Sequence, residues 1–149
     1  MAQRQFRSDD TSFWPYEYGN SSDGAYSPSS GTDAPVDSAC TGTINTTSLS
    51  ATNVSFSAGQ IILIHQTNGT GAGQWELNKI SSYVAGTITT VLPLIYDYTS
   101  GAQVIVVPQY SSANIANGVT ITVKAWTGSV GGIFVKMVNG AFTITVTLS

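Results

Sequence analysis

The fold is decided by Gln60-Ile-Ile-Leu-Ile-His-Gln66 and by the two segments that follow it, Gln74-Trp-Glu-Leu-Asn-Lys-Ile80 and Thr87-Ile-Thr-Thr-Val91. The first segment is a short apolar run between turn residues, which is typical of a buried strand. The second segment alternates, with Trp75, Leu77 and Lys79 on one side, as a half-buried strand does. The pair Ala85-Gly86 precedes the third segment and predicts a hairpin.

Further segments toward the C-terminus have the same strand-like character. Ala102–Val107 is an apolar run that Pro108 ends, and Val119–Lys124 alternates between apolar and polar residues. Asn139-Gly140 separates two alternating segments and predicts a second hairpin, because both turn residues tolerate positive φ. No segment has the period of an amphipathic helix. We therefore predict an all-β fold, with short strands that suit a small barrel or a sandwich.

Composition narrows the classes of function. The chain has 149 residues, of which 42% are hydrophobic and only 9% are charged, so one domain with its own core is expected. Five Lys and Arg residues are too few for the basic surface that nucleic-acid binding requires. The longest apolar runs are far shorter than the ~18 residues of a membrane span. Neither a nucleic acid nor a membrane is expected as a partner.

The charged residues are concentrated near the N-terminus. Residues 1–37 hold two arginines and six acidic residues, together with three prolines and no hydrophobic period. We expect residues 1–37 to form an extended N-terminal arm without a core of its own. Residues 38–149 are expected to form the β-rich body, with a barrel-like module at 38–110 and a β-helix-like or hairpin segment at 111–149.

Aromatic residues are the sharpest feature of the arm. Large aromatic side chains bury much area at low entropic cost and dominate protein interfaces. We therefore expect the arm to dock on a neighbouring subunit or on another protein, and the alternative is that it folds back as a cap on its own barrel. The expected anchors are Phe6, Phe13, Trp14, Tyr16, Tyr18 and Tyr26.

The residues that could support catalysis or metal binding are few. His65 is the only histidine, and Glu76 and Asp97 are the only acidic residues of the body that could approach it or each other. No nucleophile motif and no metal-ligand spacing accompanies them, so we expect no enzyme, no metal and no cofactor. The single cysteine, Cys40, excludes an intrachain disulfide and is expected to be a small packed residue.

The first residues, Met1–Arg7, contain no apolar stretch of the kind that a secretory signal has. The body is nonetheless rich in Ser, Thr, Gly and Asn, as an environment-facing β protein is. A protein made in a host cytoplasm and released by lysis in a virion fits both observations.

Four stretches of the body resemble a small β-barrel module that recurs ahead of parallel β-helix segments in phage structural proteins and some bacterial surface proteins. The stretches are Phe56–Gln66, Gly73–Ile80, Gly86–Leu94 and Gly101–Val106. Lys124–Gly128 with Gly131–Ile133 resembles the β-helix-like segment that follows. The resemblance covers residues 36–149 and includes no catalytic motif, so it implies a structural role and assigns no functional residue.

The leading hypothesis from the sequence is a structural virion protein of a tailed phage. Within that class we expect a homotrimeric capsid decoration (cement) protein that binds the major capsid protein through its arm. A fibre or spike base, or a receptor-binding component, is the alternative. A carbohydrate-binding adhesin domain is another, with sugar rings stacked on Trp75, Tyr110 and Trp126.

Overall fold

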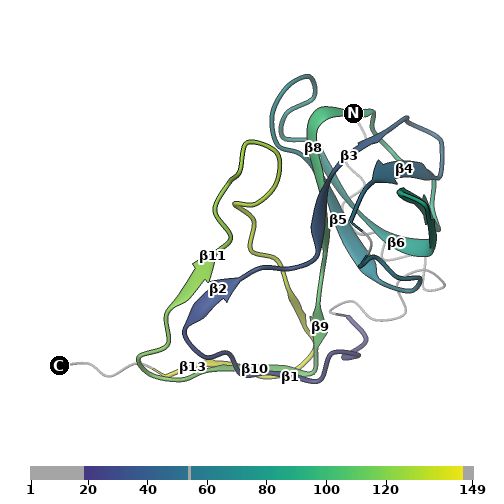
Figure 1. Cartoon of the computed structure of the whole chain (residues 1–149). Coiled ribbons are helices and arrows are strands. Elements are labelled where there is room, and N and C mark those ends of the chain that lie inside the picture. Colours follow the sequence, from purple (N-terminus) through teal and green to yellow (C-terminus); the bar gives the residue numbers. More distant parts are fainter. Residues whose placement is uncertain (1–18, 54, 146–149) are drawn as a thin grey trace. The chain divides into compact units, whose positions relative to one another are not determined.

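The computed structural model describes residues 19–53 and 55–145, and it confirms the all-β prediction. The chain divides into two compact units, each described by itself (Figure 1). The barrel unit contains Ala34–Val107 and Ala125–Gly132. The solenoid unit contains the described residues of Met1–Asp33, Pro108–Lys124 and Ile133–Ser149. The barrel unit is therefore inserted between strands of the solenoid unit.

The barrel unit is a closed, antiparallel, six-stranded barrel in the order β3-β4-β7-β6-β5-β8. Its hairpin at Ala85-Gly86 is confirmed: both residues have positive φ, 47° and 86°, and Val84 pairs with Thr87. The strands are β3 (Asp37–Gly42), β4 (Ser48–Ala51), β5 (Ile61–Gln66), β6 (Trp75–Val84), β7 (Thr87–Thr90) and β8 (Tyr98–Val106).

Strand alternation decides which side chains fill the barrel. On β5, Ile62, Ile64 and Gln66 are fully buried, whereas Leu63 and His65 on the other face are partly exposed. On β6, Glu76, Asn78 and Ile80 are buried. Trp75, Leu77 and Lys79 share the other face, as the alternation predicts, and that face is the outer one. The core is completed by Leu49, Ile88, Leu94 and Val104.

Polar side chains inside the barrel hold the loops at its ends. The Gln66 amide donates to the carbonyl oxygens of Asn68 (2.7 Å) and Ser100 (3.2 Å), and it accepts from the Thr99 N–H (2.9 Å). The Asn78 amide donates to the Leu92 carbonyl at 3.0 Å. These hydrogen bonds offset the desolvation cost of the buried amides, and they satisfy backbone groups of the loops.

The solenoid unit consists of three small parallel sheets, ordered β1-β10-β13, β11-β2 and β12-β9. The chain visits them in a repeating order, so residues 25–33, 109–123 and 137–144 form three successive coils. In Figure 1 the sheets enclose a triangle. The strands are β1 (Ala25–Tyr26), β2 (Gly31–Asp33), β9 (Gln109–Tyr110), β10 (Ser112–Ile115), β11 (Ile121–Val123), β12 (Met137–Val138) and β13 (Phe142–Ile144).

The predicted hairpin at Asn139-Gly140 is wrong. β12 and β13 do not pair with each other; β12 pairs in parallel with β9, and β13 pairs in parallel with β10. Gly140 lies at a corner between two sheets, outside the positive-φ conformation that a tight hairpin needs. A Cβ at Gly140 would overlap the carbonyl oxygen of Ser111 in the coil below. Glycine is therefore used here for close approach of two coils.

The first coil lies in the segment that the sequence analysis placed in an arm without a core. Ala25 and Tyr26 pair with Ser112 and Ala113, and Gly31–Asp33 pair with Ile121–Val123. The partners are about 90 residues away in the chain, so local periodicity cannot report the pairing. Residues 1–18 lie outside the described residues.

Candidate functional site

Five of the six predicted arm anchors, Phe6, Phe13, Trp14, Tyr16 and Tyr18, lie outside the described residues. The sixth, Tyr26, is in β1 and is half-buried inside the solenoid unit. Its ring centroid is 4.8 Å from that of Tyr110. Tyr26 therefore packs within the solenoid unit, and its role as an anchor stays a prediction.

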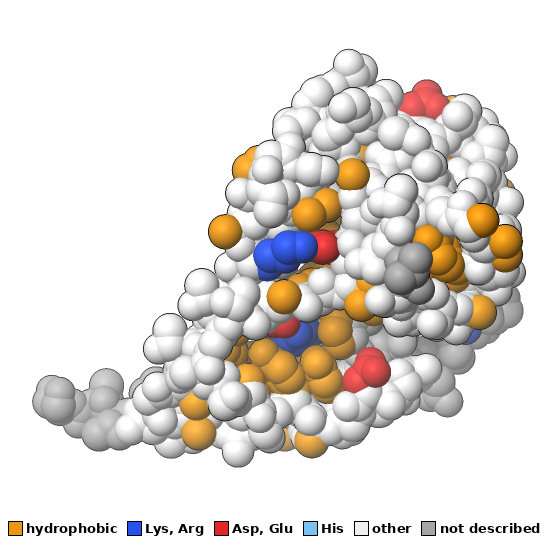
Figure 2. Space-filling view, in the orientation of Figure 1, with side chains coloured by type: hydrophobic (Ala, Val, Ile, Leu, Met, Phe, Trp, Pro, Cys, Tyr) orange, Lys and Arg blue, Asp and Glu red, His pale blue; other side chains and the backbone are white. Residues whose placement is uncertain are grey.

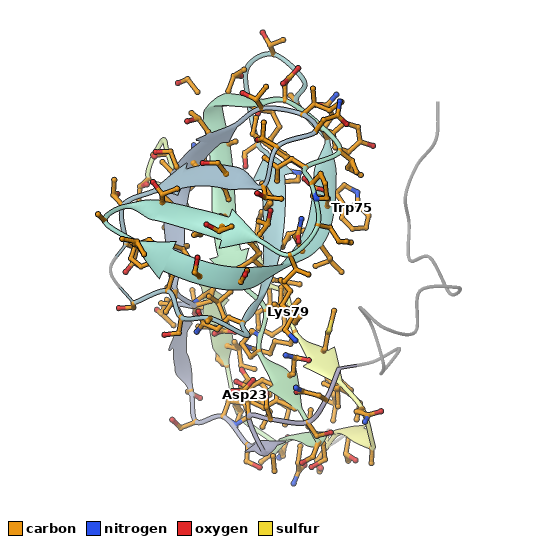
Figure 3. All side chains as sticks on the ribbon, turned by 90° about the vertical axis from the view of Figure 1, so that its right-hand side faces the viewer. Asp23, Trp75 and Lys79 are labelled. Carbon is orange, nitrogen blue, oxygen red and sulfur yellow. The ribbon has the colours of Figure 1, made fainter. Side chains whose placement is uncertain are left out.

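The three residues named for sugar stacking are not placed alike. Tyr110 packs against Tyr26 in the solenoid unit. Trp75 and Trp126 belong to the barrel unit and are 39% and 40% exposed. Trp75 lies on the outer wall of the barrel, directly across the ladder from His65 (Figure 3).

His65 lies on the outer wall, whereas the Glu76 side chain is inside the barrel, so the structure does not bring this pair together. Gln103 donates from Nε2 to Thr67 Oγ1 (2.8 Å), which leaves the Thr67 hydroxyl free to donate to His65 Nδ1 (3.0 Å). The Gln103 amide also pairs with the backbone of Gly131, at 3.1 Å and 2.9 Å. Burial lowers the pKa of His65. The network orients the imidazole ring and fastens the 125–132 loop to the barrel.

Glu76 and Asp97, the two acidic residues of the body, accept hydrogen bonds from backbone N–H groups. Glu76 accepts from the Ile95 N–H at 3.2 Å, and Asp97 accepts from the Ile44 N–H at 2.9 Å. Burial, and then the nearby Glu76 carboxylate, raises the pKa of Tyr98 in the barrel interior. Glu76 is 4% exposed, so its carboxylate is shielded from an outside substrate.

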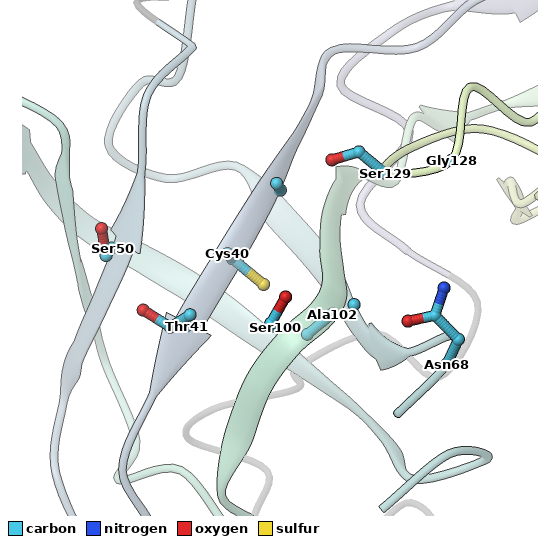
Figure 4. A pocket seen from close by; sticks show the side chains of 10 residues that line it. Cys40, Thr41, Ser50, Asn68, Ser100, Ala102, Gly128 and Ser129 are labelled. Carbon is cyan, nitrogen blue, oxygen red and sulfur yellow. The ribbon is translucent and has the colours of Figure 1, made fainter. Parts of the chain in front are cut away.

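A shallow polar groove of about 370 Å³ lies on the barrel where β3 and β8 meet the 128–129 loop (Figure 4). Thr41, Ser50, Ser100 and Ser129 supply hydroxyls to it. Burial raises the pKa of the Cys40 thiol at its floor to about 12, so little of the thiolate forms at neutral pH. The groove has no aromatic residue and no charged side chain in its lining.

The most developed candidate site is a hollow of about 360 Å³ in the solenoid unit. Phe142 lies in register with Ala113, a fully buried residue of the middle coil, yet Phe142 is 57% exposed because no further coil of the described residues covers it. Figure 2 shows hydrophobic side chains around a hollowed part of this unit. We call this site the solenoid hollow; its lining is Tyr26, Ile115, Phe134, Val135, Lys136, Val138 and Phe142.

Among the described residues that line the solenoid hollow, Lys136 has the one charged side chain. Its Nζ is 2.7 Å from Asp33 Oδ2, and the two side chains are only 8% and 17% exposed. The same Nζ lies 4.7 Å from the Tyr26 ring centroid, 5.1 Å from that of Phe134 and 5.5 Å from that of Tyr110. Asp33 is in the first coil and Lys136 adjoins the third, so this ion pair ties the two outer coils together inside an aromatic cage.

Sequence reasoning missed the solenoid hollow. Its signal was present: Phe134, Lys136 and Val138 alternate with Val135 and Met137, which puts Lys136 on an apolar face. That pattern reads as an ordinary half-buried strand until the partner strands are known. The described part of the chain contains no group of three metal-ligating side chains. Within the same residues, no helix is long and apolar enough to cross a bilayer.

No family model and no curated protein matches this chain. Among solved structures, it is similar to the gp54 tailspike of Acinetobacter baumannii bacteriophage AP22, solved in complex with an A. baumannii capsular saccharide. The identity is 8%, over 62% of this chain and 22% of the tailspike chain, and the TM-score is 0.41. For the tailspike protein gp49 from Pseudomonas phage LKA1, the identity is 8%, over 66% of this chain and 24% of that chain, and the TM-score is 0.38. The match thus spans less than a quarter of each tailspike chain, and likeness at this level assigns no function.

Proposed function

We propose that this chain is a structural component of a phage tail fibre or tailspike, in which the solenoid unit stacks on further β-solenoid. In the sequence, most of the barrel unit (Ala34–Val107) lies between the first and second coils. We include in the same proposal that the protein forms a homotrimer and that it is located in the virion.

The observation that carries the proposal is the outermost described coil. Stacked solenoids bury a continuous core, and their terminal coils need a polar outer face to stay soluble. Here Phe142 and Ile144 of the third coil are 57% and 56% exposed, and Phe134, which precedes that coil, is 47% exposed. Among the described residues, β13 pairs only with β10, so its other edge can receive another parallel strand.

Capsid decoration, the first expectation from the sequence, has less support. It required an extended arm over residues 1–37, and the described end of that segment is instead part of the solenoid. Nothing in the described part of the chain favours a shell over a tail.

The test is immunogold electron microscopy of the virions, with an antibody raised against the full chain. We expect gold at the tail. Gold spread evenly over the capsid would support the decoration hypothesis instead. Unlabelled particles would contradict the proposal that the protein is part of the virion.

Carbohydrate binding by the barrel is a second candidate, because Trp75 is exposed beside the half-buried His65 on a rigid wall. Exposed aromatic rings offer stacking platforms. A glycan array comparing the full chain with Trp75→Ala and with the control Val84→Ala decides this candidate. Specific binding that only Trp75→Ala abolishes supports it, and no specific glycan contradicts it. The absence of enzymatic activity stays a prediction.

A further inference from the structure

We propose that Asn117 is a site of spontaneous covalent modification, at which the folded protein loses the side-chain amide through a cyclic imide formed with Gly118. The sequence Asn-Gly occurs three times, at residues 68–69, 117–118 and 139–140. Because the dipeptide is the same at all three places, the surrounding structure decides which one reacts in the folded protein. The inference concerns the chemistry of the chain and does not depend on the proposed function.

The reaction needs only the chain and water. The backbone nitrogen of Gly118 attacks Cγ of Asn117, so that the N–Cγ bond forms and the Cγ–Nδ2 bond breaks. The departing amide group takes the proton of the attacking nitrogen and leaves as ammonia. Water then opens the cyclic imide at either of its carbonyls, which gives aspartate or isoaspartate, and nothing is oxidised or reduced. Glycine favours the ring closure because it has no Cβ to obstruct the approach.

Asn117 and Gly118 are the central residues of the turn that joins β10 to β11. The Val119 N–H donates to the Ala116 carbonyl at 3.2 Å, and Gly118 has φ 77°, as the third residue of a type II turn requires. Asn117 and Gly118 are both exposed, and a Cβ at Gly118 would meet no described atom within 4 Å apart from its chain neighbours. Among the described residues the Gly118 N–H has no hydrogen-bond partner. The turn therefore gives the attacking nitrogen access to water and room to move.

At Asn68, the buried Gln66 holds the peptide group that would have to move. The Asn68 carbonyl and the Gly69 N–H belong to one planar peptide group. Gln66 is fully buried, and its Nε2 donates to the Asn68 carbonyl at 2.7 Å while its Oε1 accepts from the Thr99 N–H at 2.9 Å. The Asn68 N–H donates in turn to the Gly101 carbonyl at 3.3 Å. Ring closure at Asn68 therefore requires this loop to open first.

At Asn139, close packing restrains the glycine that follows. A Cβ at Gly140 would overlap the Ser111 carbonyl oxygen, so the Gly140 backbone rests against the second coil. The Asn139 N–H donates to the Tyr110 carbonyl at 2.9 Å, and Asn139 Nδ2 lies 3.4 Å from Ser21 Oγ. Rotation of the peptide between Asn139 and Gly140 would disturb these contacts. Asn139 should therefore react more slowly than Asn117.

The products change the connection between β10 and β11. Either product adds one negative charge to a chain whose net charge is −3. Isoaspartate also routes the main chain through the former side chain, so the connection becomes one carbon atom longer. Ion-exchange chromatography can therefore separate the modified protein from the parent protein.

The experiment compares the three sites within one molecule. The full chain is incubated at neutral pH, either folded or in denaturing urea, and is then digested with trypsin. Cleavage after Lys79, Lys124 and Lys136 puts the three Asn-Gly sites in separate fragments, so mass spectrometry follows the conversion of each amide to an acid. In the folded protein we expect Asn117 to convert several-fold faster than Asn68 and Asn139. In urea the three rates should become similar, because the structure no longer protects two of the sites.

The variant Asn117→Gln is the control for the fragment 80–124, which also contains Asn114. It should abolish the conversion in that fragment and leave the conversion of Asn68 and Asn139 unchanged. Isoaspartate among the products shows the cyclic imide route, since direct hydrolysis of the amide gives aspartate alone. The proposal is overturned if the folded protein converts Asn68 or Asn139 as fast as Asn117, if Asn117 converts only in urea, or if no isoaspartate forms.

Discussion

Lys136 and Asp33 form a buried ion pair in the solenoid unit, so we expect the loss of either residue alone to destabilise this unit strongly. Removing one partner of a buried ion pair leaves an uncompensated charge, which costs about 3–5 kcal/mol, whereas replacing both by apolar residues is often neutral. We expect Lys136→Met to lower the free energy of unfolding by about 3 kcal/mol. Lys136→Met with Asp33→Leu should recover most of that loss. Urea denaturation of the four proteins in the cycle measures the coupling; additive losses would show that the pair does not act as a unit.

His65 should make the barrel sensitive to mild acid. Burial lowers the pKa of His65 in the folded state, so the unfolded chain binds the proton more readily. The contribution of neutral His65 is complete above its unfolded pKa of about 6.5 and declines as the pH falls below that value. We expect the parent chain to lose more stability than His65→Gln between about pH 7.5 and about pH 5.5. Denaturation curves at both pH values test this; parallel losses would refute it.

At the scale of elements, the β6–β7 turn can be improved. Ala85 adopts φ 47°, a left-handed conformation that its Cβ disfavours and that asparagine tolerates better. Asn-Gly is the preferred pair for this two-residue turn. Ala85→Asn should therefore raise the free energy of unfolding by about 0.5 kcal/mol. Ala85→Val should lower it, because a β-branched side chain is strained there. Thermal denaturation gives the order, and a less stable Asn variant would contradict the turn assignment.

At the corner formed by Gly140, we expect a substitution to destabilise the protein. Since a Cβ there would overlap the Ser111 carbonyl, Gly140→Ala should separate the second and third coils locally and destabilise the solenoid unit by about 1–3 kcal/mol. The neighbouring exposed change Ala141→Ser is the control and should be close to neutral. Hydrogen exchange of β10 and β13 amides reports the effect directly; unchanged protection would mean that the coils adjust freely.

These two turns show what the sequence could and could not predict. Ala85-Gly86 joins strands that are neighbours in the chain, so local pattern was sufficient. Asn139-Gly140 has the same local signature, but its flanking strands pair with β9 and β10, and the choice between the two pairings is made by contacts distant in sequence. That Trp75, Leu77 and Lys79 share one face of a strand followed from alternation, whereas the cage around Lys136 required residues from three coils.

At the scale of the whole molecule, the proposed fibre or spike role includes three copies. Exposed apolar side chains remain on the barrel, among them Val84 at 69% and Val91 at 45% exposure, and association would cover such groups. Native mass spectrometry of the full chain at micromolar concentration should show a trimer. A spectrum that shows only the monomer at that concentration would contradict the proposed homotrimer.

In the proposed function, the third coil continues into further β-solenoid in a tail structure. An electron cryo-microscopy reconstruction of the virion tests this most directly. We expect density for the barrel and solenoid units at the tail, with another parallel coil stacked on β13 at the strand spacing of about 4.8 Å. Barrel units at regular positions on the capsid shell, with solvent over Phe142 and Ile144, would contradict it.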